Sequence, residues 1–220
     1  MGRIIDISFP IDEHIAIYPS NPGFEVRRVQ DMDNGDGANV SAISMGSHTG
    51  THVDVPSHFI HGGETLDQIP LEKMCGRAKV IDATGIDDIT AEFLKKIEIC
   101  KDDILLFRTD NSNNWSCDRI LDDYITLAYD AAEYLVDRGV KLVGIDYLTI
   151  ERPRSKRIEG KSVHETLLGN GILICEALNI AGVCGGEYEF FCIPLCIKGL
   201  DGCPVRCVLR EDDNEDDEIQ

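Results

Sequence analysis

Hydrophobic and polar residues alternate over short stretches of this chain, with the period of two that is typical of β-strands. Glycine, proline, asparagine and aspartate separate these stretches and predict turns between them. Six segments follow this pattern: residues 3–8, 24–30, 38–45, 76–84, 188–197 and 205–210. The sequence DMDNGDG at 31–37 joins the second segment to the third and predicts a hairpin.

Two further runs, 103–107 and 141–145, are almost continuously apolar, as in strands that are buried on both faces. Between them, apolar residues recur every three or four positions over 120–138, which predicts the clearest helix, ended by Gly139. Strand, helix and strand in this order are typical of a parallel β–α–β unit. The periodic apolar residues are Leu121, Tyr124, Ala128, Ala131 and Leu135.

Shorter elements complete the pattern. A helix is predicted at 90–97, where a threonine can cap its first turn, and a second short helix begins at His164 and ends at the glycines of 169–171. An apolar run at 172–175 then leads to Glu176. Strands interspersed with helices, with no internal repeat or linker, predict a single α/β domain with a mixed sheet.

The 220 residues and their 43% hydrophobic content fit one domain, which we place at residues 1–210. The formal net charge of -19 argues against nucleic acid or an anionic membrane surface as a partner, because both repel an acidic protein. Part of this charge comes from EDDNEDDE at 211–218, so residues 211–220 are predicted to be a solvated, disordered tail.

Nine cysteines occur, without a CxxC pair, and several lie in apolar strand-like sequence. No basic and then apolar secretion signal opens the chain, and no apolar run approaches the length of a membrane span. We therefore expect a cytoplasmic protein in which the cysteines are reduced and mostly buried as small hydrophobic residues.

The stretch 47–60, SHTGTHVDVPSHFI, holds half of the six histidines of the chain. β-Branched residues, Gly50 and a proline argue against a helix here, so we predict extended chain with His48, His52 and Asp54 on one face. Gly50 would leave a gap between the two imidazoles. Two imidazoles and a carboxylate form a mixed N/O ligand set that suits Zn, Mn or Fe.

Three further residues have two interpretations each. His58 lies beyond the proline, where it can be a fourth ligand or an unbound acid/base. His61 is followed by two glycines and fits a loop histidine better than a ligand. Glu176 fits the polar face of an amphipathic segment, or a buried carboxylate that requires a cation.

The run HTGTHVDVPSHF resembles the signature of the cyclase family of metal-dependent hydrolases, which includes bacterial kynurenine formamidases and isatin hydrolase-like enzymes. Other segments resemble this family in the same order along nearly the whole chain outside the acidic tail. They are YPSNPGFEV, FRTDNSNNW, GIDYLTIE, HETLLGNGILICEAL and IPLCIKGLDGCPVRCVLR. The resemblance implies a mixed sheet or barrel-like core flanked by helices, often in a homodimer.

The resemblance also implies roles for individual residues. His48, His52 and Asp54 match the first metal-ligand set of the family, and His58 matches the proton donor and acceptor of kynurenine formamidases. The family's more distant ligands match His164 and Glu176, which implies one or two divalent ions, Zn or Mn, with Asp54 and Glu176 as candidate bridging ligands.

The implied reaction is hydrolysis of an amide C–N bond in a small molecule, either an N-formyl arylamine such as formylkynurenine or a cyclic amide. A metal-bound hydroxide would attack the carbonyl while His58 transfers protons. Tyr18 falls where kynurenine formamidases carry a tryptophan against the substrate, and Phe59 and Trp115 are further candidates for the pocket wall. A lactone or ester hydrolase and a non-catalytic binding protein are the alternatives; an unligated His58 favours an enzyme.

Overall fold

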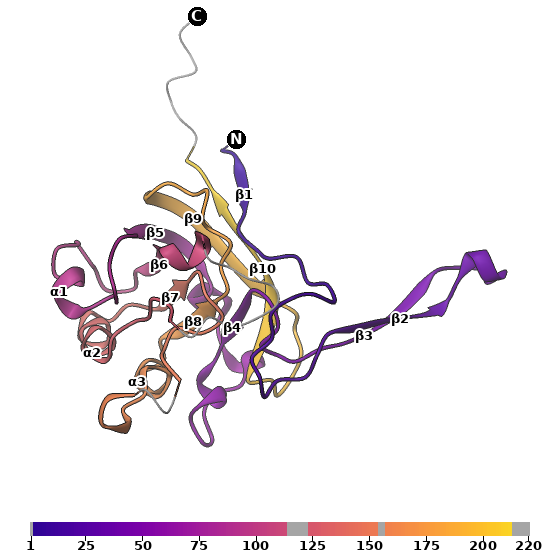
Figure 1. Ribbon diagram of the computed structural model, residues 1–220, viewed down its shortest axis with the longest axis horizontal. Helices are drawn as coiled ribbons and strands as arrows, with labels where there is room; N and C mark the ends of the chain where they lie inside the picture. Colours follow the sequence, from indigo (N-terminus) through magenta and orange to yellow (C-terminus); the bar gives the residue numbers. More distant parts are fainter. Residues whose placement is uncertain (1, 114–122, 154–156, 213–220) are drawn as a thin grey trace, which may run out of the picture.

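The computed structural model describes residues 2–113, 123–153 and 157–212, and within them a sheet closes into a barrel (Figure 1). The ring runs β10–β4–β8–β7–β6–β5–β9 and closes through the pairing of β9 with β10, while β1 extends the edge of β10. The strands are β1 (Ile4–Asp6), β4 (His52–Asp54), β5 (Cys75–Ala83), β6 (Ile104–Thr109), β7 (Leu142–Ile145), β8 (Leu173–Glu176), β9 (Gly186–Pro194) and β10 (Gly202–Arg210).

The sheet is mixed, as predicted. β5, β6, β7 and β8 are parallel neighbours, and β4, β9 and β10 close the ring with antiparallel pairs. Parallel strands need a crossover, and the helix between β6 and β7 provides one of these connections. The predicted α/β class, the single domain and the barrel-like core are therefore confirmed.

Three helices cover one side of the barrel (Figure 1): α1 (Ala91–Leu94), α2 (Tyr129–Arg138) and α3 (Val163–Gly169). Side-chain oxygens cap two of them, because Thr90 accepts from the Phe93 amide and Ser162 accepts from the Glu165 amide. Short 3₁₀ turns occur at Met32–Asn34, Pro56–His58, Leu66–Gln68, Leu71–Lys73, Asp110–Asn113 and Ile158–Gly160. None of the helices within the described ranges is both long and apolar enough to cross a bilayer.

The predicted helix at 120–138 is wrong over residues 123–128, which are not helical. α2 begins only at Tyr129, and residues 114–122, with Trp115 and Leu121, lie outside the described residues. Before the helix, the Leu127 amide donates to the Ile150 carbonyl and the Ala128 amide to the Ile89 carbonyl. These long-range backbone hydrogen bonds hold the segment extended, although its apolar spacing favours a helix.

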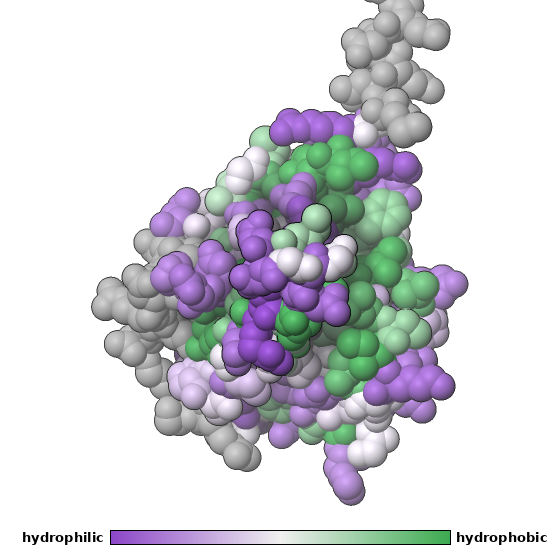
Figure 2. All heavy atoms as spheres, turned by 90° about the vertical axis from the view of Figure 1, so that its right-hand side faces the viewer, coloured by the Kyte–Doolittle hydropathy of each residue, from purple (hydrophilic) through white to green (hydrophobic). Residues whose placement is uncertain are grey.

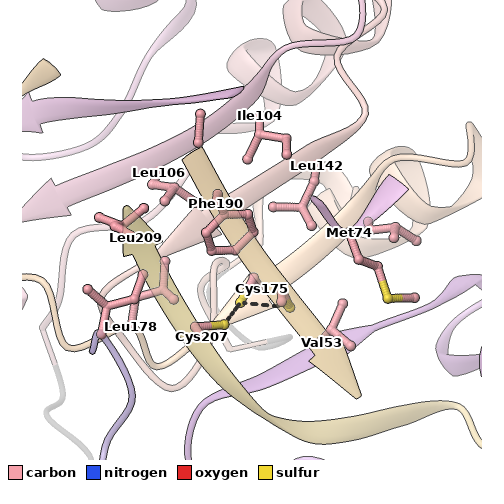
Figure 3. Close-up of a cluster of buried hydrophobic side chains, with 14 of the residues drawn as sticks. Val53, Met74, Ile104, Leu106, Leu142, Cys175, Leu178, Phe190, Cys207 and Leu209 are labelled. Carbon is pink, nitrogen blue, oxygen red and sulfur yellow. Dashed lines mark hydrogen bonds between the residues drawn. The ribbon is translucent and has the colours of Figure 1, made fainter. Parts of the chain in front are cut away.

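The strands separate two hydrophobic cores. In β6, Ile104 and Leu106 face the barrel interior, while Leu105 and Phe107 face the helices, because side chains alternate along a strand. Three thiols lie together inside the barrel (Figure 3): Cys175 Sγ is 3.6 Å from Cys207 Sγ and 3.9 Å from Cys192 Sγ. All three are free and buried among apolar side chains, and Cys203 is buried too. Cys100, Cys184 and Cys196 are exposed, so the burial predicted for most of the cysteines is wrong for these three. Cys117 lies outside the described residues.

The predicted hairpin is confirmed and stands apart from the barrel. β2 (Glu25–Gln30) pairs antiparallel with β3 (Val40–Ser44), and the turn between them contains the 3₁₀ segment Met32–Asn34. Figure 1 shows this ribbon, hereafter the β2–β3 arm, projecting far from the body of the molecule. Every residue of both strands is exposed.

The boundary between the domain at 1–210 and the acidic tail at 211–220 remains a prediction, since residues 213–220 lie outside the described residues.

Candidate metal centre

The candidate centre lies on the outer face of the barrel, between strands β4 and β8 and the start of helix α3. His52 is directly opposite Glu176 in the register of the two strands, and Asp54 points to the same side two residues later. The intervening Val53 faces the barrel interior. His164, in the first turn of α3, approaches these side chains from the helix layer. Strand alternation therefore places the ligand-type residues outside the barrel and the apolar ones inside it.

The extended conformation predicted for residues 48–54 is confirmed in β4 but wrong before it. Residues 47–50 form a turn, in which Gly50 has a left-handed φ of 61°, and Pro56–His58 form a 3₁₀ turn. Gly50 leaves no gap for an ion, since a Cβ there would lie 2.9 Å from Ile11 Cγ1. His48 nevertheless turns toward β4.

Room for His48 comes from a glycine distant in sequence. A Cβ on Gly202 would lie 2.6 Å from His48 Cε1 and 2.8 Å from the Val53 carbonyl oxygen. Gly202 is opposite Asp54 in the pairing of β10 with β4. A side chain at 202 would therefore displace the imidazole from the centre.

Three imidazoles and two carboxylates converge at the centre, with one nitrogen of each imidazole facing a carboxylate oxygen. This nitrogen is called the inner nitrogen below. Asp54 Oδ1 lies 2.7 Å from His48 Nδ1 and 3.3 Å from His52 Nε2, while Asp54 Oδ2 lies 3.6 Å from His164 Nε2. Glu176 Oε1 is 3.1 Å from His164 Nε2, and Glu176 Oε2 is 3.5 Å from His52 Nε2. Asp54 thus lies among three imidazoles and Glu176 between two of them.

The other ring nitrogen of each imidazole, which points away from the two carboxylates, already has a hydrogen-bond partner. His48 Nε2 is 2.9 Å from Asp201 Oδ2, His52 Nδ1 is 2.8 Å from the Gly50 carbonyl oxygen, and His164 Nδ1 is 2.8 Å from Glu151 Oε1. Such partners fix the tautomer and orientation of a metal-binding histidine and increase its basicity. All three inner nitrogens are therefore directed at Asp54 and Glu176.

Protons stabilise this buried cluster when no cation is bound. Burial would lower the pKa of His164, but its hydrogen bonds to Glu151 and Glu176 raise that pKa to about 10. The pKa of His52 is likewise raised well above its ordinary value, against the effect of burial, by Asp54 and Glu176. Burial would raise the pKa of Asp54, but contacts with His48 and His52 hold it well below its ordinary value. The pocket therefore favours positive charge between its carboxylates.

A divalent metal fits this donor set. Asp54 is fully buried, yet its Oδ2 atom has no hydrogen-bond partner among the described residues. A buried, unpaired carboxylate oxygen is costly unless a cation accompanies it. Imidazole nitrogens together with carboxylate oxygens form a set that suits first-row divalent ions.

His58 lies at the rim of the cluster. Its ring stacks on His48 with 3.9 Å between centroids, and its Nδ1 is 3.5 Å from Asp201 Oδ2. Burial lowers the pKa of His58 below its ordinary value, so the ring is neutral near pH 7. His48, Asp54 and His58 also lie close enough for one ion to contact all three, so the distances alone permit either role. His61 is exposed and does not line the pocket.

A cavity of about 230 Å³ opens onto the cluster, and His48, His52, His58, His164 and Glu176 form its floor. Tyr18 and Phe59 belong to its wall, together with polar and charged residues of the two loops that follow β1 and β7. Phe59 also stacks on the His164 ring, with 4.5 Å between centroids. The remaining wall residues are Ser20, Asn21, Leu148, Thr149, Glu151, Arg152, Pro153 and Arg157.

Sequence reasoning missed two residues of the centre, Glu151 and Asp201. Glu151 is buried and contacts the Val163 amide at 2.6 Å, Ser162 Oγ at 3.1 Å and the Arg157 guanidinium, besides His164. Its only signal in the sequence is a glutamate directly after the apolar residues of YLTI. Asp201 precedes a glycine and has the sequence context of an ordinary turn residue.

Comparison with known proteins finds relatives along most of the chain. The family model described as "Putative cyclase" matches residues 5–152. A kynurenine formamidase of Bacillus thuringiensis (strain Al Hakam) is 31% identical over 206 residues, which are 94% of this chain and 96% of the relative. A kynurenine formamidase of Bacillus anthracis is 30% identical over 95% of this chain and 98% of its own length.

Solved structures share the fold. A potential metal-dependent hydrolase with cyclase activity is 36% identical, with a TM-score of 0.82 over 96% of this chain and 100% of that chain. Isatin hydrolase A of Labrenzia aggregata has a TM-score of 0.82 over 94% of this chain and 93% of its own; at 24% identity this likeness concerns the fold alone. The chain belongs to the cyclase family of metal-dependent hydrolases. It is a hydrolase, and the ligand set described above is its candidate centre for a divalent metal.

Proposed function

We propose that this enzyme hydrolyses an amide C–N bond in a small molecule, either an N-formyl arylamine or a cyclic amide. The observation that carries the proposal is the convergence of three pre-oriented imidazole nitrogens on two buried carboxylates at the floor of an open cavity. Similarity to kynurenine formamidases over 94% of the chain supports the amide class.

The ligands suggest two positions for Zn or Mn. His48, His52 and Asp54 Oδ1 would hold the first ion, and His164, Glu176 Oε1 and Asp54 Oδ2 the second. A divalent ion supplies Lewis acidity, which lowers the pKa of a water ligand from about 15.7 to about 7 and polarises a carbonyl. Asp54 would contribute to both positions, because its two oxygens face different imidazoles.

His58 is proposed as the general acid/base. It lies at the mouth of the cluster, and its lowered pKa keeps it neutral near pH 7, as a base must be. It would take a proton from the attacking water and return it to the leaving nitrogen. Asp201, 3.5 Å from His58 Nδ1, would hold the ring with Nε2 free for that transfer.

The wall of the cavity would bind the organic part of the substrate. Tyr18 presents a phenol that is 36% exposed, where an aromatic substrate could pack. Arg152 and Arg157 reach the same cavity, but each is already paired with acidic side chains.

A substrate screen tests the proposal. The protein is reconstituted with Zn or Mn and offered N-formyl arylamines, cyclic amides, lactones and esters. We expect turnover of at least one amide class that disappears with the chelated protein. Turnover of only lactones or esters would replace the amide proposal, and metal-independent turnover would refute it. The cytoplasmic location and the homodimer remain predictions from the sequence.

A further inference from the structure

Three thiols meet inside the barrel, on the opposite side of its wall from the candidate metal centre. Cys175, Cys192 and Cys207 come from three different strands, β8, β9 and β10. Cys192 and Cys207 are opposite each other in the pairing of β9 with β10. Closure of the ring brings Cys175 to them from β8, which is separated from β10 by β4. All three side chains lie among the apolar side chains of the inner core (Figure 3).

The three sulfur atoms form a small triangle. Cys175 Sγ lies 3.6 Å from Cys207 Sγ and 3.9 Å from Cys192 Sγ, and the third pair of sulfurs lies within 4.8 Å. A metal ion that is bound by three sulfurs in one plane, with metal–sulfur bonds of about 2.3 Å, holds these sulfurs about 4.0 Å apart. The three side chains therefore already have nearly the spacing that a trigonal ion requires.

The surroundings of this triangle favour a soft ion of low charge. Sulfur ligands select Cu(I) or Zn over Mg, Ca or Mn. Zn takes a fourth ligand to complete a tetrahedron, whereas Cu(I) accepts three sulfurs in a plane. All three cysteines are 0% exposed, and a net charge in an apolar interior is costly. Cu(I) that displaces a single thiol proton to solvent leaves a neutral site with one thiolate and two thiol ligands.

We propose that Cys175, Cys192 and Cys207 form a binding site for one Cu(I) ion inside the barrel, hereafter the three-thiol site. The bound ion links β8 to the β9–β10 pair across the interior, and it stabilises the folded barrel because the unfolded chain does not hold the three sulfurs together. Cys175 and Glu176 lie on opposite faces of β8, so the three-thiol site is separate from the candidate metal centre. Cu(I) binding there is therefore independent of the amide hydrolysis proposed above.

Entry of an ion into the three-thiol site requires the barrel to open. The three thiols are fully buried, and Figure 2 shows the cover of side chains on the face of the molecule from which the β2–β3 arm projects. Native proteins open locally, and such openings become more frequent as the stability of the fold decreases. We therefore expect the ion to load and to leave slowly, in contrast to an ion bound at an exposed thiol.

A Cu(I) titration tests the proposal in a background without competing thiols, Cys100→Ser/Cys117→Ser/Cys184→Ser/Cys196→Ser. The reduced full chain is first saturated with Zn at the candidate metal centre. Without oxygen and just below its thermal midpoint, it is then equilibrated with Cu(I) and a chromophoric Cu(I) chelator. We expect one Cu(I) per chain, with three sulfur neighbours at about 2.3 Å by X-ray absorption at the copper edge. Absence of bound Cu(I), or copper with nitrogen or oxygen neighbours, would overturn the proposal.

Single substitutions in the same background identify the ligands. Cys192→Ala and Cys207→Ala should each weaken Cu(I) binding by more than about 100-fold, since loss of a ligand costs more than loss of a ligand's partner. Cys203→Ala is the matched control, because Cys203 is also buried inside the barrel on β10 but is not one of the three converging thiols.

The thermal midpoint provides an independent measurement. Cu(I) should raise the midpoint of the background protein and of Cys203→Ala, but not that of Cys207→Ala. If Cys192→Ala, Cys207→Ala and Cys203→Ala all bind Cu(I) equally well, the three thiols are not its ligands. The X-ray absorption measurement needs no substitution inside the barrel, so it decides the outcome even where one of these variants does not fold.

Discussion

Replacing Glu151 with glutamine removes one negative charge from the centre without changing the size of the side chain. The carboxylate accepts from the Val163 amide, Ser162 Oγ, His164 Nδ1 and the Arg157 guanidinium. A glutamine offers only one oxygen to these donors. Whichever way it is oriented, its amide NH₂ must face groups that donate hydrogen bonds. His164 therefore loses either its partner or the charge that makes its inner nitrogen a strong ligand.

The magnitude follows from this geometry. Loss of an outer partner of a metal-binding histidine typically costs about 10–100-fold in metal affinity, which corresponds to about 1.4–2.8 kcal/mol. We expect the weakening at the His164 position, because His48 and His52 keep their own partners. In Glu151→Gln, one ion should therefore bind as tightly as in the wild type, and the ion at the His164 position should bind more weakly.

The assay is a competition titration of the metal-free protein with Zn and a chromophoric chelator. Glu165→Gln is the matched control, because Glu165 lies one residue after His164 on the same helix but is exposed. Circular dichroism and the thermal midpoint verify that each variant is folded. If Glu151→Gln binds both ions as tightly as Glu165→Gln, then Glu151 does not support the centre in the way described.

Three further predictions concern the same centre. His58→Ala should lower kcat by about 10²–10⁴-fold with metal content unchanged, whereas His61→Ala in the exposed loop should change neither; normal turnover of His58→Ala would exclude its proton-transfer role. Chelator-treated protein should lose thermal stability as the pH rises from about 6.5 to about 10. The pKa of His164 is raised to about 10 in the folded state, and its proton stabilises that state only while it is bound. A thermal midpoint that is flat or rising over this pH range would contradict this reasoning. Gly202→Ala should lose metal and activity and should also lower the thermal midpoint, because its Cβ would lie 2.6 Å from His48 Cε1 and 2.8 Å from the Val53 carbonyl oxygen. A variant with full metal content and an unchanged midpoint would refute this crowding.

The sequence predicted the elements whose pattern is local. Period-two alternation identified the strands, and the spacing of turn residues identified the β2–β3 hairpin. The helix predicted at 120–138 was wrong over residues 123–128, because the backbone there pairs with Ile89 and Ile150, which are distant in sequence. Apolar spacing alone does not distinguish a helix from an extended segment that is buried by such long-range pairing.

The candidate ligands converge in space, although the local conformation expected for them was partly wrong. The turn at Gly50 and the space at Gly202 bring His48 to the cluster, where an extended strand was expected. Glu151 and Asp201 were missed because their function depends on the histidine that each one faces, and those pairs are 13 and 153 residues apart. Such partners become recognisable only once the chain is folded.

The residues of the centre come from core-packed strands and a helix, whereas those of the cavity wall come largely from loops. Most of the candidate ligands lie on β4, β8 and α3, whose opposite faces pack in the hydrophobic cores. The cavity wall comes largely from the loops after β1 and β7. A directed-evolution library confined to those loops, with Glu151 kept unchanged, can therefore explore new substrates while the candidate metal centre and the fold stay intact. Libraries that include β8 would instead alter ligand position and core packing together, since Cys175 and Glu176 are adjacent residues on opposite faces of one strand.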